Sequence, residues 1–404
     1  MRPWRAPFPK FGVGPGLARV DKAARALGID LTRFGETGAV IVGSNGKGST
    51  AAMTAALLQQ TGRNVGLFTS PHLLDLNERF RLNGDDIADE ELEAHWERVL
   101  TAVRSAGEQD NFGAFEFLFL VAAVFFAAND CAHTVWEAGI GGRLDPVRLI
   151  RAPRLALTSL DLEHTDLLGD TLEAIARDKL DAARAGAKVF YGESCNGQRA
   201  VIESHCATRG IEPVLVSAID QAPLPGGFQA QNAALALALA RDIAVLSPEQ
   251  TDAGFAATRW PGRLEIIDRA PLTVIDVGHT PAGVRAALDG FNEMRSAPSG
   301  VLVLGVSLDK GVAEIVGVLA PAFEAIICVA ARHKGAPPAQ IAARAAAANP
   351  SAEIAIAESV EEARRLALSE AGEGGVVYVA GGLFLAAEYK AVHSGRDPAS
   401  LVFF

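Results

Sequence analysis

Residues 39–50 read AVIVGSNGKGST, and this stretch decides the fold class. Its first five residues predict a buried strand, and a helical pattern over 48–61 follows the glycine-rich turn. Such a turn points backbone N–H groups at an anion, and the N-terminus of the helix adds partial positive charge. Lys47 can reach terminal phosphates, and the hydroxyl residues can offer a ligand to Mg²⁺. We therefore expect a nucleotide phosphate loop made by Asn45, Gly46, Lys47, Gly48, Ser49 and Thr50.

The spacing of this loop differs from the common phosphate-loop pattern. Ile41 stands where the first glycine would be, and Gly48 separates Lys47 from Ser49. An ordinary tight turn between a strand and a helix would explain the glycines alone. The lysine and the two hydroxyls on the first helical turn favour the nucleotide.

Short apolar strands alternate with alanine-rich helical segments along the whole chain. Because the strands lack polar alternation, they predict parallel strands buried on both faces, as in a doubly wound α/β sheet. The segment WPGR at 260–263 separates two sets of such strands. We expect a nucleotide-binding domain with the phosphate loop over 1–261 and a smaller, Rossmann-like α/β domain over 262–404. Helices are also predicted over 172–185 and 335–372. The clearest strands are 65–69, 134–139, 154–160, 188–192, 272–278, 301–307, 325–330 and 376–382.

Composition narrows the class of protein. The net charge of −11 disfavours a nucleic-acid binder, and 49% hydrophobic with 21% charged residues is ordinary for a globular chain. Four cysteines without a CxxC pair predict reduced thiols in the cytoplasm. Residues 1–10 lack the apolar run of a signal peptide, and the longest apolar run, 117–128, is too short to span a bilayer. We expect no membrane partner.

Seven further motifs accompany the phosphate loop in a fixed order. Together they resemble the folylpolyglutamate synthase and dihydrofolate synthase family of the Mur ligase superfamily over nearly the whole chain. The resemblance implies an ATP-dependent ligase that adds L-glutamate to a folate-type acid, dihydropteroate or tetrahydrofolate, through an acyl phosphate. It also implies that the domain over 1–261 binds ATP and the domain over 262–404 ligates glutamate, in a monomer whose partners are small molecules. The motifs are GPGLARVDKAARALGI (14–29), TSPHLLDLNERFRLNGDDI (69–87), FEFLFLVAAVFF (115–126), WEAGIGGRLD (136–145), LTSLDLEHTDLLGDTLEAIARDK (157–179), WPGRLEII (260–267) and DVGHTP (276–281).

The resemblance also assigns metal ligands. It implies two Mg²⁺ sites held by Ser49, Ser70, Glu137 and His164, with Lys179 carbamylated beside them. From the residues alone, Glu137 could be a solvated carboxylate at a strand end. Because Mg²⁺ prefers oxygen ligands, His164 would be a structural histidine. Lys179 would be a surface salt bridge, and Asp181 nearby adds negative charge that disfavours a carbamate.

Further residues are implied for ATP and for catalysis. Arg263 suits a phosphate by its planar guanidinium, and Asp276 and His279 end the first strand of the second domain. Asn232 is implied on the nucleotide side, with helix N-capping as the equal alternative. The catalytic set is Lys47, His164, Lys179 and Arg263.

Two departures from the family pattern concern the amino-acid half of the site. Thr280 stands where the family has asparagine, and Gly382 stands where it has serine. The segment Arg332-His333-Lys334 offers positive charge for an anionic amino acid, with a solvated loop as the alternative. Three readings stay open: the folate ligase, the same chemistry on a non-folate acid or another amino acid, and a nucleotide-binding relative without ligase activity.

Overall fold

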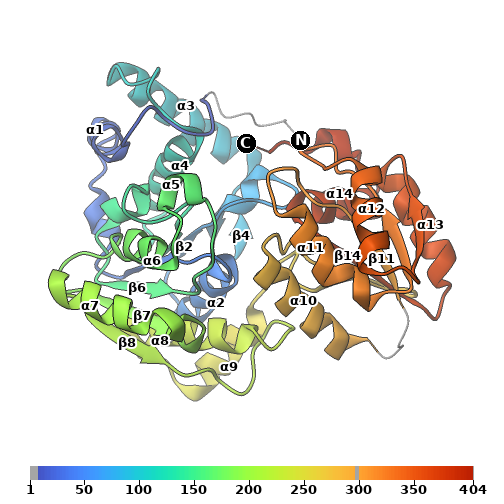
Figure 1. Cartoon of the computed structure of the whole chain (residues 1–404). Helices are drawn as coiled ribbons and strands as arrows, with labels where there is room; N and C mark the ends of the chain where they lie inside the picture. Colours follow the sequence, from blue (N-terminus) through green and yellow to red (C-terminus); the bar gives the residue numbers. More distant parts are fainter. Residues whose placement is uncertain (1–7, 296–299, 404) are drawn as a thin grey trace.

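The computed structural model describes residues 8–295 and 300–403, which form two α/β lobes (Figure 1). Of the N-terminal residues considered for a signal peptide, 1–7 lie outside the described residues. Each lobe contains one sheet with a hydrophobic core on each of its two faces. Among the described residues, no helix is both long enough and apolar enough to cross a membrane.

The sheet of the first lobe has eight strands in the order β4-β3-β2-β5-β1-β6-β7-β8. The pairs β2–β3 and β3–β4 are antiparallel, and all other pairs are parallel. The strand that leads into the phosphate loop, β1, therefore lies in the interior of the sheet. The bounds are β1 Gly38–Val42, β2 Val65–Phe68, β3 Phe80–Leu82, β4 Asp85–Asp86, β5 His133–Glu137, β6 Arg154–Leu157, β7 Lys188–Gly192 and β8 Glu212–Val216.

Helices cover both faces of this sheet. One face carries α2 (Lys47–Gln59), α8 (Gln229–Ile243) and α9 (Pro248–Ala257). The other carries α1 (Leu17–Ala26), α3 (Asp89–Ser105), α4 (Ala114–Ala128), α6 (Leu172–Leu180) and α7 (Arg199–Arg209). The short α5 (Thr165–Leu168) lies in the loop after β6. Helix α4 is apolar around most of its circumference because it is buried inside the core.

The sheet of the second lobe has six strands in the order β13-β12-β11-β14-β10-β9, and only the pair β10–β9 is antiparallel. Helices α10 (Pro281–Met294), α11 (Val312–Leu319) and α12 (Pro338–Ala348) cover one face, and α13 (Val360–Ala371) and α14 (Leu383–His393) cover the other. The strands are β9 Glu265–Arg269, β10 Leu272–Ile275, β11 Val301–Leu304, β12 Ala325–Cys328, β13 Glu353–Ile356 and β14 Val376–Ala380.

The predicted fold class, a doubly wound α/β sheet with a second α/β domain, is confirmed. Several details differ. The helix predicted over 172–185 ends at Leu180, and 335–372 contains β13 between its two helices. The predicted strands from 65–69 onward end up to three residues early, except 188–192, because the chain turns there to form the loops of the site. The predicted domain boundary between 261 and 262 falls in the linker from α9 to β9.

Candidate functional site

The site gathers at the carboxyl ends of the parallel strands in the first lobe. The phosphate loop follows β1, Ser70 follows β2, Glu137 ends β5, and the segment with Glu163 and His164 follows β6. These strands are neighbours in the sheet, so their ends meet along one edge. Open α/β sheets bind ligands at this edge.

The phosphate loop is held by its neighbours in the sheet. The carbonyl of Asn45 accepts hydrogen bonds from Thr158 Oγ1 (2.6 Å) and Ser159 Oγ (3.0 Å). Gly46 has φ 86°, and a Cβ at this position would lie 2.4 Å from Asn232 Oδ1. Only glycine fits this turn without strain.

The side chain of Lys47 folds back over the loop. Its Nζ donates to the carbonyls of Gly43 (2.8 Å) and Ser44 (3.2 Å). The ammonium group therefore lies at the mouth of the loop, where its charge acts on Glu137 and Glu163. This is the position from which a lysine can neutralise phosphate oxygens.

Polar side chains from α8 meet the first turn of α2. Gln229 Nε2 donates to Ser49 Oγ (3.3 Å), and Asn232 Nδ2 donates to Gln229 Oε1 (2.9 Å). Asn232 is not an N-cap, because the N-cap of α8 is Phe228. The Oγ1 of Thr50 is fully buried without a hydrogen-bond partner among the described residues. Ser49 and Thr50 thus each bring a buried hydroxyl to the first turn of α2.

Glu137 and Ser70, which were each predicted as metal ligands, lie together. The Ser70 backbone N–H donates to Glu137 Oε2 (3.0 Å), and Arg79 Nη1 donates to Ser70 Oγ (3.0 Å). Burial raises the pKa of Glu137 to about 7, although Lys47, the Ser70 N–H and Arg263 all favour its ionised form. A buried carboxylate whose charge is incompletely compensated is a suitable ligand for a divalent cation.

Lys179 is 1% exposed and pairs with Glu163, not with either of the aspartates beside it in the sequence. Its Nζ donates to Glu163 Oε1 (2.8 Å) and to the carbonyl of Gly43 (3.1 Å). Burial lowers the pKa of Lys179. Burial opposes the ionisation of Glu163, but Lys47 and Lys179 prevail and lower its pKa to about 2. The view of Lys179 as a surface salt bridge is wrong, since the pair is buried beside the phosphate loop.

The two aspartates near Lys179 face elsewhere. Asp178 accepts from the Gly142 and Arg143 backbone N–H groups and pairs with the Arg143 side chain. Asp181 pairs with His205 and Arg209. The charge of Asp181, which counted against a carbamate on Lys179, is thus neutralised away from the site.

His164 follows Glu163 at the start of α5 and has φ 47°, an uncommon backbone conformation for a non-glycine residue. Burial lowers the pKa of its imidazole, and Lys310 from the second lobe adds to this effect. A neutral imidazole is the form that binds metals. Among the described residues, no group of three or more His, Cys, Asp or Glu could hold a metal ion by itself. A metal here would need further oxygens from phosphate or water.

The second lobe brings Asp276 and His279 to the same place. Asp276 is buried and accepts from the N–H groups of Leu264 (3.1 Å) and Gly278 (2.7 Å). Burial lowers the pKa of His279 to about 4, with Lys310 and Arg263 contributing. Sequence reasoning missed Lys310. The signal available was its place in the loop after β11, at the same sheet edge as His279.

Thr280 connects the two lobes at the phosphate loop. It is the N-cap of α10, since its Oγ1 accepts from the Gly283 N–H (3.1 Å), and the same hydroxyl donates to Asn45 Oδ1 (3.3 Å). Helix α2 begins at Lys47, two residues after Asn45. Two helix N-termini, one from each lobe, therefore converge on one loop. Thr280, which stands where the family pattern has asparagine, therefore lies against the phosphate loop.

The residues predicted for the amino acid lie at the carboxyl edge of the second sheet. Arg332 and Lys334 are exposed, and Lys334 pairs with Asp309 (3.3 Å). His333 packs edge-on against Phe384, with ring centroids 4.4 Å apart. Gly382 is the N-cap of α14, and a Cβ there would lie 3.9 Å from Ser307 Oγ. This loop is therefore built around aromatic packing as well as charge.

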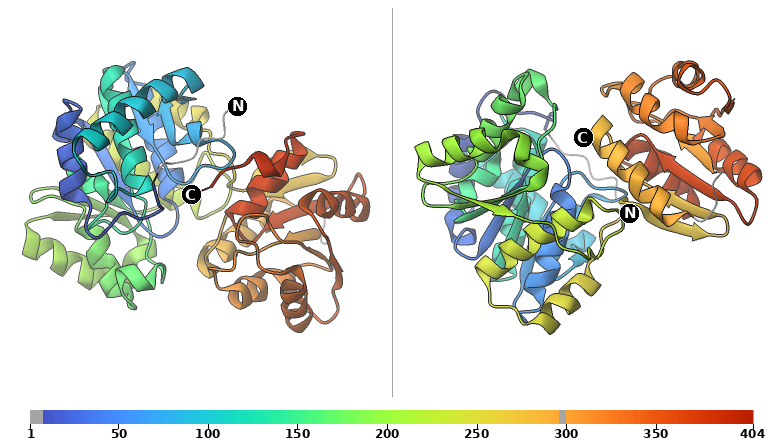
Figure 2. Two further views of the ribbon diagram at one scale, coloured as in Figure 1. Left: turned by 90° about the horizontal axis from the view of Figure 1, so that it is seen from above. Right: turned by 60° about the horizontal axis from the view of Figure 1, so that its bottom comes forward.

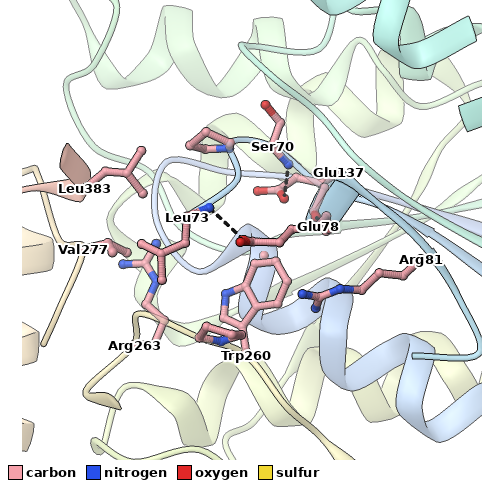
Figure 3. A pocket seen from close by; sticks show the side chains of 13 residues that line it. Ser70, Leu73, Glu78, Arg81, Glu137, Trp260, Arg263, Val277 and Leu383 are labelled. Carbon is pink, nitrogen blue, oxygen red and sulfur yellow. Dashed lines mark hydrogen bonds between the residues drawn. The ribbon is translucent and has the colours of Figure 1, made fainter. Parts of the chain in front are cut away.

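A cleft lies between the first lobe, the linker at 260–263 and the second lobe (Figure 3). Ser70, Glu137 and Trp260 line it, with Arg263 and Arg81 on either side of the Trp260 indole in this view. Arg263 donates no hydrogen bond to another described residue, so its guanidinium is available to an anion. The cavity volume is about 60 Å³, which holds a few waters at about 15 Å³ each. A folate-sized acid requires the walls to move apart.

Comparison with known proteins supports the same interpretation. Residues 262–383 match the family model of the Mur ligase glutamate ligase domain. A probable bifunctional folylpolyglutamate synthase/dihydropteroate synthase of Halobacterium salinarum is 30% identical over 94% of this chain, which spans 50% of that protein's length. The folylpolyglutamate synthase of Lacticaseibacillus casei is 30% identical over 72% of this chain and 75% of its own.

Solved structures agree with these relatives. Escherichia coli FolC in complex with DHPP and ADP has a TM-score of 0.86 at 25% identity, covering 96% of this chain and 95% of its own. A bifunctional folylpolyglutamate synthase/dihydrofolate synthase with Mn, AMPPNP and L-glutamate bound has a TM-score of 0.82 at 26% identity, covering 97% of this chain and 99% of its own. Given this agreement in sequence, fold and loop geometry, the chain belongs to the folylpolyglutamate synthase and dihydrofolate synthase family of the Mur ligase superfamily.

Proposed function

We propose that this protein is an ATP-dependent ligase that joins L-glutamate to a folate-type carboxylate. The observation that carries the proposal is the convergence of α2 and α10, from different lobes, on Asn45 beside Lys47. Two helix N-termini and a lysine favour a polyphosphate at this position. A nucleotide bound there would contact both lobes at once.

The chemistry takes place in two steps. An oxygen of the acid's carboxylate attacks the γ-phosphorus of ATP, forming an acyl phosphate and releasing ADP. The amine of glutamate then attacks the acyl carbon, so the C–O bond to phosphate breaks, and an amide, inorganic phosphate and a proton leave. Both steps concentrate negative charge on phosphoryl oxygens, which fixed positive groups stabilise. Lys47 and Arg263 supply positive charge, and both lie near enough to Glu137 to favour its ionised form.

The residues present fit a divalent cation. Ser49, Thr50 and Ser70 offer hydroxyl oxygens, and Glu137 offers a buried carboxylate with a pKa raised to about 7 by its burial. An oxygen donor set of this kind suits Mg²⁺. When bound, the cation would neutralise charge on the phosphate oxygens. We propose that His164 and Glu163 lie at a second metal site, close enough to Lys47 for its charge to lower the pKa of Glu163.

We also propose that Lys179 is carbamylated in the active enzyme. Carbamylation needs the neutral amine, which attacks CO₂ and releases a proton, and burial lowers the pKa of Lys179. The product would be an anion beside Glu163, so a cation between them would be required for charge balance. ¹³C-bicarbonate NMR of the intact protein tests this: a carbamate signal that is absent in Lys179→Met supports it, and no signal in a fully active enzyme contradicts it.

The nature of the two substrates is supported most directly by relatives. The family model names a glutamate ligase domain, and structures of relatives hold DHPP or L-glutamate. Thr280 departs from the family at a place that contacts the phosphate loop, so it bears on ATP as well as on glutamate. Gly382 lacks a hydroxyl, but Ser307 lies on the adjoining loop.

Phosphate release is the test of this proposal. The protein, Mg²⁺ and ATP should release phosphate only when a folate-type acid and L-glutamate are both present, and the Lys47→Ala variant should not. Dihydropteroate, tetrahydrofolate, a non-folate carboxylic acid and L-aspartate make the panel. If the non-folate acid, and neither folate-type acid, supported turnover with an amino acid, the folate assignment would be refuted while the ligase chemistry would stand. Nucleotide binding without turnover on any pair would refute the ligase.

A further inference from the structure

Residues 396–403 follow α14 and lie between the two lobes (Figure 2), and Leu401 and Phe403 pack against the core of the second lobe. We name this segment the interdomain strap. Its first residue, Arg396, donates from Nη1 and Nη2 to the two carboxylate oxygens of Asp75, at 2.7 and 2.9 Å. This two-point ion pair joins the strap to the loop 70–79, which follows β2 and carries Ser70.

The other end of the strap packs on His72. The ring of Phe403 stacks on the imidazole, with centroids 5.5 Å apart and an interplanar angle of 14°. The same ring contacts His333 (5.4 Å) and Phe384 (4.8 Å) of the second lobe. One aromatic side chain therefore lies between a histidine from each lobe. Aromatic pairs at such distances contribute packing with a defined orientation.

Both ring nitrogens of His72 have partners. Its Nε2 donates to the carbonyl of Val402 in the strap (2.7 Å), and its Nδ1 accepts from Arg79 Nε (2.9 Å). Because an arginine N–H can only donate, Nδ1 must carry the lone pair and Nε2 the proton. The two partners therefore fix both the tautomer and the orientation of the ring, as partners of a ring nitrogen do in metal sites.

The hydrogen bonds continue from His72 to the proposed metal ligands. The Nη1 of Arg79 donates to Ser70 Oγ, and the Ser70 N–H donates to Glu137 Oε2. Arg79 is 5% exposed, so its guanidinium is held in one place by these bonds and by the loop around it. A continuous path thus runs from a segment of the second lobe to the Ser70–Glu137 pair of the first.

We propose that His72 is a positioning residue for the ligase reaction: it orients Arg79, and through Arg79 the Ser70–Glu137 pair, while the interdomain strap holds His72 in place. The proposal rests on the function proposed above. It makes the geometry of the metal ligands depend on contact between the two lobes. His72 acts through Arg79 and is not itself in contact with the reacting atoms.

Two substitutions separate the two bonds of His72. Asparagine can place its amide oxygen near the position of Nδ1, so His72→Asn keeps an acceptor for Arg79 and loses the bond to the strap. Glutamine can place its amide N–H₂ near Nε2, so His72→Gln keeps the bond to Val402 and loses the acceptor. Phe403→Leu and Arg396→Gln weaken the contacts of the strap with the loop 70–79 without changing any residue of the loop. Arg25→Gln, which removes an exposed ion pair with Asp21, is the matched control.

Two measurements are made on the full chain. The first is kcat and KM for ATP, Mg²⁺, tetrahydrofolate and glutamate. We expect His72→Gln to lower kcat about tenfold, which corresponds to about 1.4 kcal/mol, with Tm little changed. His72→Asn should retain most of kcat. The second is amide hydrogen exchange of residues 70–79 without nucleotide or metal, which Phe403→Leu and Arg396→Gln should accelerate while Arg25→Gln does not.

The outcomes are distinguishable. Unchanged exchange at 70–79 in both strap variants would overturn the role of the strap, whatever the activity. Full kcat in His72→Gln, or equal losses in His72→Gln and His72→Asn, would overturn the orienting of Arg79. If the wild type ligates nothing, the proposed function fails, while faster exchange in the strap variants would still support the physical coupling.

Discussion

The buried carboxylate of Glu137 should make the metal-free protein less stable as the pH rises. Burial raises its pKa from an ordinary value of 4.5 to about 7. Between these two values, the folded protein holds a proton that the unfolded chain has released. The free energy of unfolding therefore falls with rising pH across this window. At about 1.4 kcal/mol per pKa unit, the whole effect is about 3 kcal/mol.

Glu137→Gln removes this effect and keeps the shape of the side chain. The amide oxygen can still accept the Ser70 N–H. We expect the variant to be more stable than wild type by about 3 kcal/mol at pH 8 and by only about 1 kcal/mol at pH 5, where Glu137 is protonated in the folded state. The same variant should lose ligase turnover. A gain in stability that accompanies a loss of function is usual for charges buried in active sites.

Urea unfolding at pH 5, 6, 7 and 8 in EDTA measures the difference. Glu212→Gln, at an exposed position on β8, is the matched control for the loss of one carboxylate. Equal stability of wild type and Glu137→Gln at pH 8, or a difference that does not vary with pH, would refute the reasoning. Added Mg²⁺ should stabilise wild type more than the variant, since a cation that binds only the folded state adds to its stability.

The remaining predictions concern the phosphate loop. Lys47→Ala should lower turnover by about a hundredfold or more, equivalent to about 2.7–4 kcal/mol, because a fixed charge at the phosphates is lost, and its urea midpoint should stay near wild type; normal turnover would remove the lysine from the mechanism. Gly48→Ala places a Cβ 2.4 Å from the Trp260 ring, so the indole must move; we expect altered Trp fluorescence and a lower kcat/KM, and an unaltered spectrum would argue against the contact. Thr280→Ala removes an N-cap, so we expect a loss of about 1 kcal/mol in urea unfolding, which Thr280→Ser should largely restore; equal losses in both variants would mean that the hydroxyl is not the stabilising group.

The order of the elements could be predicted because each interior strand of the two sheets has a recognisable sequence pattern. Strands such as β1 and β14 are apolar on both faces, and a glycine or a turn follows each of them. Edge strands carry a weaker signal. β8 contains Pro213 and is only partly buried, and β13 lies mostly exposed in an alanine-rich stretch, where helix propensity dominates the sequence pattern.

The site could be predicted only as far as its residues lie in motifs. Lys47, Ser70 and Glu137 could be predicted as site residues because each lies at or just after the end of a strand within a recognisable pattern. The partner of Lys179 could not be predicted, because Asp178 and Asp181 are nearer to it in the sequence than Glu163. Only the folded helix shows that both aspartates point away from Lys179. Lys310 was missed for a similar reason: its effect on His164 arises from the approach of the two lobes, and its effect on His279 from neighbouring loops of the second sheet, which no local pattern records.

The small volume of the cleft has a consequence for fidelity. An acyl phosphate is hydrolysed if water reaches it before the amine does, and each such event consumes ATP without making an amide. A cavity of about 60 Å³ between Glu137, Trp260 and Arg263 must widen as the substrates enter, so the substrates occupy the space that opens and leave little room for water. Amide formed and phosphate released should therefore remain close to one to one. Substitutions of Trp260 that widen the cavity should first raise the amount of phosphate released per amide formed, before the rate of ligation falls.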